Sequence, residues 1–458
     1  MRNRTYLTLV LVAVFALGAC TSEASPSSSP SGSAPLASEG PAASQPAAAA
    51  PCAAESSQED PMMEGVEANA EISFWTYYLS PTFDEYIKCT IARFEAAYPG
   101  VKVNWEDHQA SYLDDYRNSI NSGNQPDVAN LSNNEGWVQE FAQAGKLLDL
   151  TENAPQEIVD QYFPNLFADN LVNDHSFQFP WYQAIAVELI NTKIYKEDPA
   201  DFPTSIDALP ALCQAIKDES GTLCDIRLTV NDYLTQMTYE GGVKAMNDDR
   251  TEFTFDSPEA VAWLQMYVDM VKAGTVDTDA LTTALDRVAL LIFSAGQAPF
   301  YQTGPQLIRV VKSNNPDLYD NLALAPLPLG KSGVTQPTSM AISVKKDTQF
   351  PNASMALAAF FTGPRAMLDF AKIVPIYPST PAAYDDPFFS EQPELIEDSA
   401  RPLAKDLISK QQNILIPIPH KKDVNDIVRQ AVESALFGGV SAQEALSGAV
   451  DQANALLP

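Results

Sequence analysis

Residues 179–195 read FPWYQAIAVELINTKIY and place two aromatic side chains directly before a short apolar run. Short apolar runs rich in β-branched residues are typical of buried strands. Trp181 and Tyr182, at the mouth of such a strand, are candidates for a ligand-facing surface, because their rings offer contact area together with a polar tip. The alternative interpretation of this stretch is a core strand with ordinary aromatic packing.

The first twenty residues predict export. Arg2 and Arg4 precede an apolar run over residues 7–17, and the sequence LGAC follows at 17–20. A basic start, a short apolar segment and small residues at the cleavage point form a secretory signal peptide, here residues 1–19, that is too short to span a bilayer. The cysteine resembles that of the bacterial lipobox, which implies acylation of Cys20. A plain signal peptide with a chance cysteine is the alternative.

Residues 20–69 are expected to form a disordered tether behind the lipidated cysteine. Ser, Pro, Ala and Gly dominate this segment, and residues 21–69 contain no Lys or Arg. Such a composition buries too little apolar surface to fold. We therefore expect an exported protein that is lipid-anchored on the outer face of the cytoplasmic membrane or in the periplasm.

Length and charge limit the remaining possibilities. Subtracting signal and tether from 458 residues leaves roughly 390, which is typical of two domains. The 28 Lys and Arg residues against 59 Asp and Glu residues give a net charge of −31. This balance argues against nucleic acid or an anionic membrane surface as a partner. We expect a monomer.

The cysteines predict disulfides in an oxidising compartment. Apart from Cys20, four remain, which are Cys52, Cys89, Cys213 and Cys224. Cys213 and Cys224 bracket a short helix-to-strand connection, which favours their pairing and leaves Cys52 with Cys89. A metal site is the alternative. It is disfavoured because no C-x-x-C spacing occurs and the three histidines are scattered, so we expect no metal and no cofactor.

Strands and helices alternate in the first third of the folded part. Strands are expected at 71–78, 101–105 and 127–131, with helices at 81–98, 112–120 and 137–144. This order is typical of an α/β domain with a mainly parallel sheet, which binds ligands at the carboxyl ends of its strands. The polar or aromatic residues at those ends are Tyr77, Tyr78, Asp107, Asn133, Asn134 and Glu135. Each could equally serve turn formation.

Several motifs, in order along residues 71–458, resemble those of one family. They are Phe74-Trp75, Gly123-x-x-Pro126-Asp127-Val128, AGKLLDLT at 144–151, Asn191-Thr192-Lys193 and Phe293-x-x-Gly296-Gln-Ala-x-Phe-x-x-x-Gly304-Pro305. Near the C-terminus they are Val432-x-x-Ala435-Leu436-x-Gly438, Ala442-x-Glu444-Ala445-Leu446 and Asn454. Together they resemble the extracellular solute-binding proteins of ABC importers, in the family of maltose- and multiple-sugar-binding lipoproteins. Ile190 departs from the family pattern, which has tyrosine there.

The resemblance implies a type II periplasmic-binding-protein fold. In this fold two α/β lobes, each with a mainly parallel sheet flanked by helices, are joined by hinge crossovers. By likeness, the first lobe holds residues 71–184 and 336–382, and the second holds 185–335 and 383–458. Partners would be the transmembrane subunits of an ABC permease, and no catalysis is implied.

The resemblance also implies a sugar site in the cleft. Sugars need aromatic stacking and hydrogen-bonding side chains. Besides the strand-end residues, likeness assigns Trp181, Tyr182, Asn231, Tyr233, Tyr301, Gln306, Ser339 and Tyr377 to the site. Asp107 and Glu135 are the only acids in this set, which favours a neutral sugar. The family commonly has tryptophan at the position of Gln306, so we expect a mono- or disaccharide rather than a long malto-oligosaccharide.

Three alternatives stay open at this point. The same fold could bind a glycerophosphodiester or a polyol. It could also bind ferric iron through tyrosines, although Tyr377 lacks an adjacent tyrosine. A secreted glycan-active hydrolase is the third; it is disfavoured because no serine stands in a G-x-S-x-G elbow and no histidine is placed as an evident base.

Overall fold

The computed structural model describes residues 56–457, apart from 134–135, 227, 229–231, 282–285, 392 and 416–417. The signal peptide, Cys20, Cys52 and most of the predicted tether therefore lie outside the described residues. None of the helices within the described part is long and apolar enough to cross a membrane.

The described strands form two sheets. The first sheet has the order β2-β1-β3-β8-β4-β9, and the second has the order β6-β5-β7. The strands of the first sheet are β1 (Glu71–Tyr77), β2 (Lys102–His108), β3 (Val128–Ser132), β4 (Phe179–Ala184), β8 (Thr338–Val344) and β9 (Tyr377–Pro378). Those of the second are β5 (Val187–Asn191), β6 (Phe300–Thr303) and β7 (Leu322–Pro326). We call the parts built on the two sheets the first and the second lobe.

The helices follow the strands in an α/β order. In the first lobe they are α1 (Asp84–Ala97), α2 (Tyr112–Ser122), α3 (Trp137–Gln143), α4 (Leu150–Asn153), α5 (Gln156–Val159), α6 (Pro164–Phe167), α14 (Pro351–Thr362) and α15 (Pro364–Ala371). The others are α7 (Leu209–Ser220), α8 (Tyr233–Gly241), α9 (Pro258–Ala273), α10 (Thr278–Leu281), α11 (Asp286–Ser294), α12 (Ile308–Asn314), α13 (Pro316–Tyr319), α16 (Arg401–Ser409), α17 (Lys421–Phe437) and α18 (Ala442–Asn454). Short 3₁₀ turns are η1 (Pro199–Asp201), η2 (Ile206–Ala208), η3 (Pro305–Leu307), η4 (Pro381–Asp385), η5 (Pro387–Phe389) and η6 (Ile396–Asp398).

The predicted α/β class is confirmed, but the sheets are mixed rather than mainly parallel. β1 pairs in parallel with β2 and β3. β8, which enters from far along the chain, is antiparallel to both β3 and β4. The described pairs of the second sheet are all antiparallel. The sequence motifs could not show this, because strand direction depends on where each later segment returns to the sheet.

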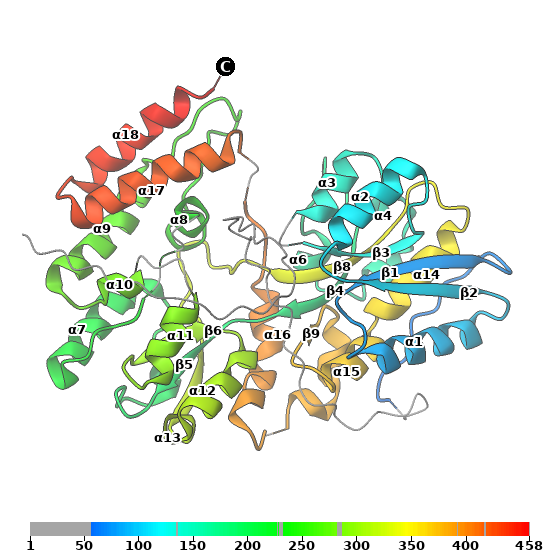
Figure 1. Ribbon diagram of the computed structural model, residues 1–458, viewed down its shortest axis with the longest axis horizontal. Coiled ribbons are helices and arrows are strands. Elements are labelled where there is room, and N and C mark those ends of the chain that lie inside the picture. Colours follow the sequence, from blue (N-terminus) through cyan, green and yellow to red (C-terminus); the bar gives the residue numbers. More distant parts are fainter. Residues whose placement is uncertain are drawn as a thin grey trace, which may run out of the picture. The chain divides into compact units, whose positions relative to one another are not determined.

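Alternating apolar residues explain the layers of the first lobe. Along β3, Val128 packs into one core with Phe74 and Phe361, whereas Ala129 and Leu131 pack into another core. Successive strand residues point to opposite faces. Both faces of the sheet are therefore apolar and must be covered. Figure 1 shows α2 and α3 on one side of this sheet and α1, α14 and α15 on the other.

The second lobe has a core of its own around α7, α8, α9, α17 and α18. The core that contains Phe74, Val128 and Phe361, however, is not confined to one lobe. It contains residues of β5, α11 and α12 as well as residues of the first sheet, and it also takes in 384–408. The lobe boundaries inferred from the sequence thus remain a prediction, because apolar packing is continuous across part of the junction.

Three chain connections cross between the lobes next to one another. They are residues 184–187, 327–337 and 409–415; the third follows α16, which packs on the core of the first sheet, and so lies later in the chain than the predicted boundary at residue 382. Gln411 Nε2 donates to the carbonyl oxygen of Ala184 at 2.7 Å. The backbone of Thr335 is hydrogen-bonded to Lys410 and Gln412, at 2.9 and 3.0 Å. These bonds join all three crossings into one short hinge.

Residues 56–70 pack on the first lobe, which corrects the prediction that the disordered tether extends to residue 69. Pro61 and Met63 are buried. The carboxylate of Glu67 accepts hydrogen bonds from the backbone of Asn352 and Ala353, at 3.1 and 2.7 Å. These are otherwise unpaired donors of the first turn of α14, so an acidic group there stabilises the helix.

The predicted disulfide between Cys213 and Cys224 is confirmed. Their Cα atoms are 5.7 Å apart, and both residues are fully buried, Cys213 within α7 and Cys224 after its end. Cys89 is also disulfide-bonded. Its predicted pairing with Cys52 stays a prediction, since Cys52 lies outside the described residues.

We expect the double variant Cys213→Ala/Cys224→Ala to unfold more easily than the wild type. The cross-link closes a short loop of sequence separation 11, and a loop of that size restricts the unfolded chain by about 2–3 kcal/mol. Guanidinium unfolding measures the difference directly, without reducing Cys89. An unchanged midpoint and slope would contradict a stabilising role for this bond.

Candidate functional site

Two cavities of about 700 and 740 Å³ adjoin at α8, because Asp232, Thr235 and Gln336 line both. The first cavity lies between residues of the first lobe, including Asn133 and Asp169, and residues of the second. The second cavity is lined by the hinge, α8 and the second sheet. Both volumes fall in the range of small-molecule sites.

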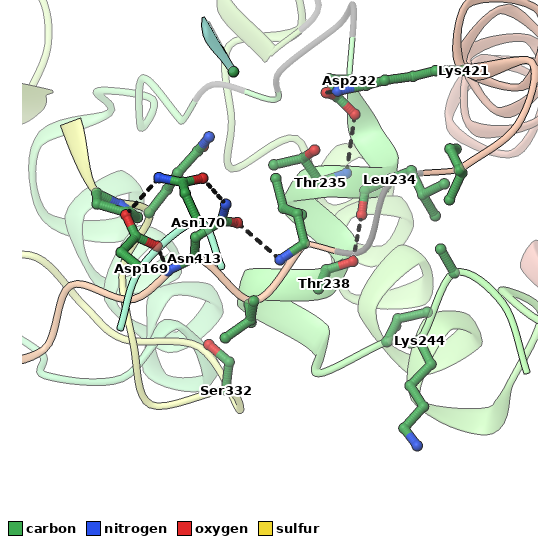
Figure 2. A pocket seen from close by; sticks show the side chains of 18 of the residues that line it. Asp169, Asn170, Asp232, Leu234, Thr235, Thr238, Lys244, Ser332, Asn413 and Lys421 are labelled. Atoms are coloured by element: carbon green, nitrogen blue, oxygen red, sulfur yellow. Dashed lines mark hydrogen bonds and ion pairs between the residues drawn. The ribbon is translucent and has the colours of Figure 1, made fainter. Parts of the chain in front are cut away.

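The first cavity has a polar wall on each side. Figure 2 shows Asp169, Asn170 and Asn413 grouped on one side and Asp232 and Thr235 of α8 on the other. The carboxylate of Asp232 accepts a hydrogen bond from the backbone of Thr235 at 3.2 Å and so caps the first turn of α8. The local sequence thus positions this acid at the rim of the cavity.

Asn133 and Ser339, both predicted as site residues, meet at the first cavity. Asn133 Nδ2 donates to Ser339 Oγ at 2.9 Å, and Asn133 lines the cavity. Its amide oxygen Oδ1 is buried and has no hydrogen-bond partner among the described residues. A buried acceptor without a donor is costly. This oxygen is therefore available to a hydroxyl or N–H group of a ligand.

Tyr301 and Gln306, also predicted, line the second cavity. Tyr301 is 2% exposed and its ring stacks on Phe293, so it contributes a wall rather than a free stacking platform. Gln306 folds back over Gly304. A Cβ atom at Gly304 would lie 2.3 Å from Gln306 Oε1, so a larger residue there would displace the end of the Gln306 side chain.

Tyr77, Tyr78 and Asp107 lie together at the strand ends but line neither cavity. The two tyrosine rings are 4.7 Å apart, and Tyr78 is 41% exposed. The carboxylate of Asp107 accepts from Thr76 Oγ1 and from the backbone of Leu79, at 2.7 and 3.0 Å. Its evident task is therefore to hold the loop after β1, which was the alternative left open for it.

Tyr182 is half-buried next to this group. Burial raises the pKa of its hydroxyl, and the nearby Asp107 and Tyr77 raise that pKa further. The electrostatic effect of both neighbours indicates that Tyr182 approaches the strand-end residues from β4. It thus remains a candidate contact at the edge of the cleft.

Three residues predicted to contact a ligand are buried in the protein core and line neither cavity. Trp181, Tyr233 and Tyr377 are 0, 1 and 2% exposed. The indole of Trp181 lies against Tyr182, Phe361 and Phe370, with ring centroids 5.1 to 6.3 Å apart. The register of β4 changes between Pro180 and Gln183. Trp181 and Tyr182 lie within this change, and both rings contact Phe370. The predicted Asn134, Glu135 and Asn231 lie outside the described residues.

Asp169 is a buried cavity residue that the sequence did not reveal. It is 3% exposed, and its carboxylate accepts from Asn170 Nδ2 at 3.0 Å and from the backbone of Asn413 at 3.2 Å. Burial raises the pKa of the Asp169 carboxyl to about 7, and hydrogen bonds from the backbone of Asn413 and of Asn170 partly offset this rise. Asp169 and Asn413 are 244 positions apart, so no local pattern could have paired them.

The cavities are more acidic than predicted. The predicted site residues include only Asp107 and Glu135 as acids, whereas Asp169, Glu188, Asp225, Asp232 and Glu240 line one cavity or the other. Glu240 accepts hydrogen bonds from Gln236, Trp263 and Tyr267, each at 2.7 Å. Burial raises the pKa of its carboxyl, and these three donors counteract the rise.

One further cluster lies apart from both cavities. Asp149, Glu152 and His175 each offer a ligand atom, and these atoms lie within 4.8 Å of one another. Asp149 Oδ2 is 2.5 Å from His175 Nδ1. Glu152 is exposed and Asp149 caps α4, so an ordinary surface ion pair accounts for the group.

Two α/β lobes, a three-crossing hinge and polar cavities beside that hinge define a protein that holds a solute. Residues 79–368, more than half of the 458-residue chain, match the family model of the bacterial extracellular solute-binding proteins. The chain belongs to this family. This match confirms the family resemblance that was inferred from the motifs.

Solved structures of several binding proteins share the fold. A candidate oligosaccharide periplasmic-binding protein from Synechococcus sp. MITs9220 is 21% identical, with a TM-score of 0.70, 84% of this chain covered and 98% of that chain. The cyclic α-maltosyl-1,6-maltose binding protein from Arthrobacter globiformis is 20% identical, with a TM-score of 0.66 and the same coverages. A maltose-bound protein of T. maritima is 23% identical, with a TM-score of 0.58 and coverages of 85% and 100%.

Replacement of Trp181 should reduce stability rather than ligand affinity. Removing a fully buried indole typically costs about 3–5 kcal/mol of unfolding free energy, and Trp181→Phe should cost less because it leaves a smaller cavity. Denaturant unfolding checks this expectation. A Trp181→Ala protein with unchanged stability but weakened ligand binding would contradict the core assignment.

Asp169 should make the stability of the protein depend on pH near neutrality. Its pKa is raised to about 7 in the folded protein, so the folded state holds this proton more tightly than the unfolded chain. The associated stability is complete at acidic pH below the unfolded pKa and is lost as pH rises through about 7. The Asp169→Asn variant should not show this loss of unfolding free energy, which is on the order of 2–4 kcal/mol at pH 8 in the wild type.

The measurement compares denaturant unfolding of wild type and Asp169→Asn between pH 5 and pH 8 (values chosen to bracket about 7). The exposed Asp160→Asn is the matched control. Parallel pH profiles for all three proteins would show that Asp169 is ionised in both states.

Proposed function

We propose that this protein captures a sugar, a mono- or short oligosaccharide, between its two lobes and delivers it to an ABC-type permease. The observation that carries the proposal is the pair of adjoining cavities at the hinge. Both contain carboxylate and amide acceptors, and aromatic residues such as Phe300 and Tyr301 line the second. This combination suits a ring that has apolar faces and many hydroxyl donors.

Family membership and the solved relatives support the same proposal. These relatives are named for binding oligosaccharides, maltose and a cyclic maltosyl-maltose. In two further structures of this fold the proteins are named as ABC substrate-binding proteins, one with cycloalternan and one with tagatose. The lipid anchor at Cys20 and the monomeric state belong to the proposal as well.

Capture would be a change of population rather than a chemical step. The hinge joins three connections by a few hydrogen bonds, and a ligand that contacts both lobes favours the arrangement in which both sets of contacts form. Asn133 and Asp169 would contact the ligand from the first lobe, and residues of α8 would contact it from the second. The proposal requires no nucleophile, metal or cofactor.

A thermal-shift screen of the chain from residue 21 onward tests this function. The panel contains mono- and disaccharides, polyols, glycerophosphodiesters, peptides and ferric ion. A ligand that binds only the native state adds about 2.7 kcal/mol of stability at a hundredfold excess over its dissociation constant. We expect a clear rise with one sugar class. A response to iron, peptides or phosphodiesters alone would be compatible with the fold but would contradict the proposal that the ligand is a sugar.

Substitution of Asn133 should weaken binding of the sugar found in that screen. Its unpartnered Oδ1 offers an acceptor, and loss of one such hydrogen bond costs roughly 1 kcal/mol. We expect Asn133→Ala to raise the dissociation constant measured by calorimetry about fivefold or more, while Gln443→Ala on the exposed face of α18 leaves it unchanged. Equal affinities in both variants would remove the first cavity from the site.

A further inference from the structure

The third crossing forms part of the wall of both cavities. Asn413, Ile414 and Leu415 line the first cavity, and Gln411 lines the second. From the first lobe, the carboxylate of Asp169 accepts a hydrogen bond from the backbone of Asn413 at 3.2 Å, and Figure 2 shows these two residues together at one side of the first cavity. A ligand that fills the first cavity therefore lies against the same segment that joins the lobes.

Tyr239 of α8 holds this segment from the second lobe. Its hydroxyl donates to the carbonyl oxygen of Gln412 at 3.0 Å and accepts from the backbone N–H of Ile414 at 3.3 Å. These two residues flank Asn413, so the crossing is bonded alternately to α8 and to the first lobe. The carbonyl oxygen of Tyr239 also accepts from Ser332 Oγ in the second crossing at 2.6 Å. Tyr239 thus joins α8 to two of the three crossings.

The hydroxyl of Tyr239 is a protonated donor in a sheltered place. Tyr239 is 8% exposed and lines the second cavity. Burial raises the pKa of its hydroxyl to about 12, while the backbone hydrogen bond from Ile414 lowers this pKa and the nearby Asp169 raises it. At neutral pH the hydroxyl therefore keeps its proton, which it needs to donate to Gln412. The electrostatic effect of Asp169 also indicates that the bonds from the two lobes lie close together along the crossing.

We propose that Tyr239 is a positioning residue that couples occupancy of the cavities to the arrangement of the two lobes. Its hydroxyl fixes the third crossing against α8, so that the cavity walls of both lobes face a bound sugar together. Without that hydroxyl the crossing can take more positions relative to α8, and the fraction of molecules in the binding-competent arrangement falls. The apparent affinity then falls by the same fraction. The inference rests on the proposed capture of a sugar and names a residue on which that capture depends.

Tyr162 in the first lobe provides a matched comparison. Its hydroxyl is hydrogen-bonded to Thr362 Oγ1 at 2.6 Å, and Tyr162 is 2% exposed. Tyr162 is not among the residues that line either cavity. The variants Tyr239→Phe and Tyr162→Phe both lose a sheltered phenol hydroxyl while keeping the ring, and the first also loses its contacts with a crossing. A hydroxyl that serves stability alone would give the two variants the same ligand affinity.

Calorimetry compares the wild type with both variants, using glucose, maltose, cellobiose and each further sugar that shifts the thermal midpoint. For every sugar that the wild type binds, we expect Tyr239→Phe to raise the dissociation constant about fivefold or more, as loss of one hydrogen bond allows. Tyr162→Phe should change it by less than about twofold. The midpoint of denaturant unfolding should fall in both variants. Equal affinities in the wild type and Tyr239→Phe would overturn the proposal while the sugar function stands.

Hydrogen exchange of the unaltered protein decides the case in which Tyr239→Phe fails to fold. The amide of Ile414 is bonded to Tyr239, and a bound sugar should slow its exchange about threefold or more by favouring the arrangement in which that bond forms. Exchange within α1, which packs on α14 and α15 of the first lobe, should not change. An unaltered rate at Ile414 in saturating sugar would reject the positioning role. If no sugar binds the wild type, the proposed function fails and this proposal is rejected with it.

Discussion

The hydrogen bonds that fasten the three crossings to one another are the constraint on which the rest of the structure depends. Gln411 binds the backbone of the first crossing through Ala184, and the backbones of Thr335 and its neighbours join the second to the third. The lobes therefore share one short pivot instead of three independent linkers. Both cavities lie beside that pivot, and Gln411 belongs to the hinge and to a cavity wall at once. A ligand bound there contacts the element about which the lobes would move.

Burial of acids next to the pivot is the second organising feature. Asp169 and Glu240 sit on opposite lobes, and burial raises the pKa of each carboxyl while neutral partners hold it in place. Placing carboxylates where water is scarce has a cost in folding free energy. Functional sites are where such costs are commonly found. The pattern is consistent with a protein that trades some stability for a strongly polar site.

The sequence predicted the features that local patterns encode. The alternation of strands and helices and the pairing of Cys213 with Cys224 follow from spacing and residue type. Features that depend on distant contacts were not predictable. β8 joins the sheet in the antiparallel sense, Asn413 meets Asp169 across 244 positions, and the register change within β4 places Trp181 in the core. The family likeness named residues that line the cavities, such as Asn133 and Tyr301, but could not separate them from residues of the core such as Trp181.

The packing of residues 56–70 has a mechanical consequence. Glu67 is bonded to the first turn of α14, and Met63 donates to the hydroxyl of Tyr98, so this segment is attached to the first lobe at several points. A force applied to the chain before residue 56 therefore acts on the first lobe and not across the hinge. With the lipid anchor proposed at Cys20, the first lobe would be the stationary part and the second lobe the one that moves, so a force from the anchor would not oppose opening or closing of the cleft.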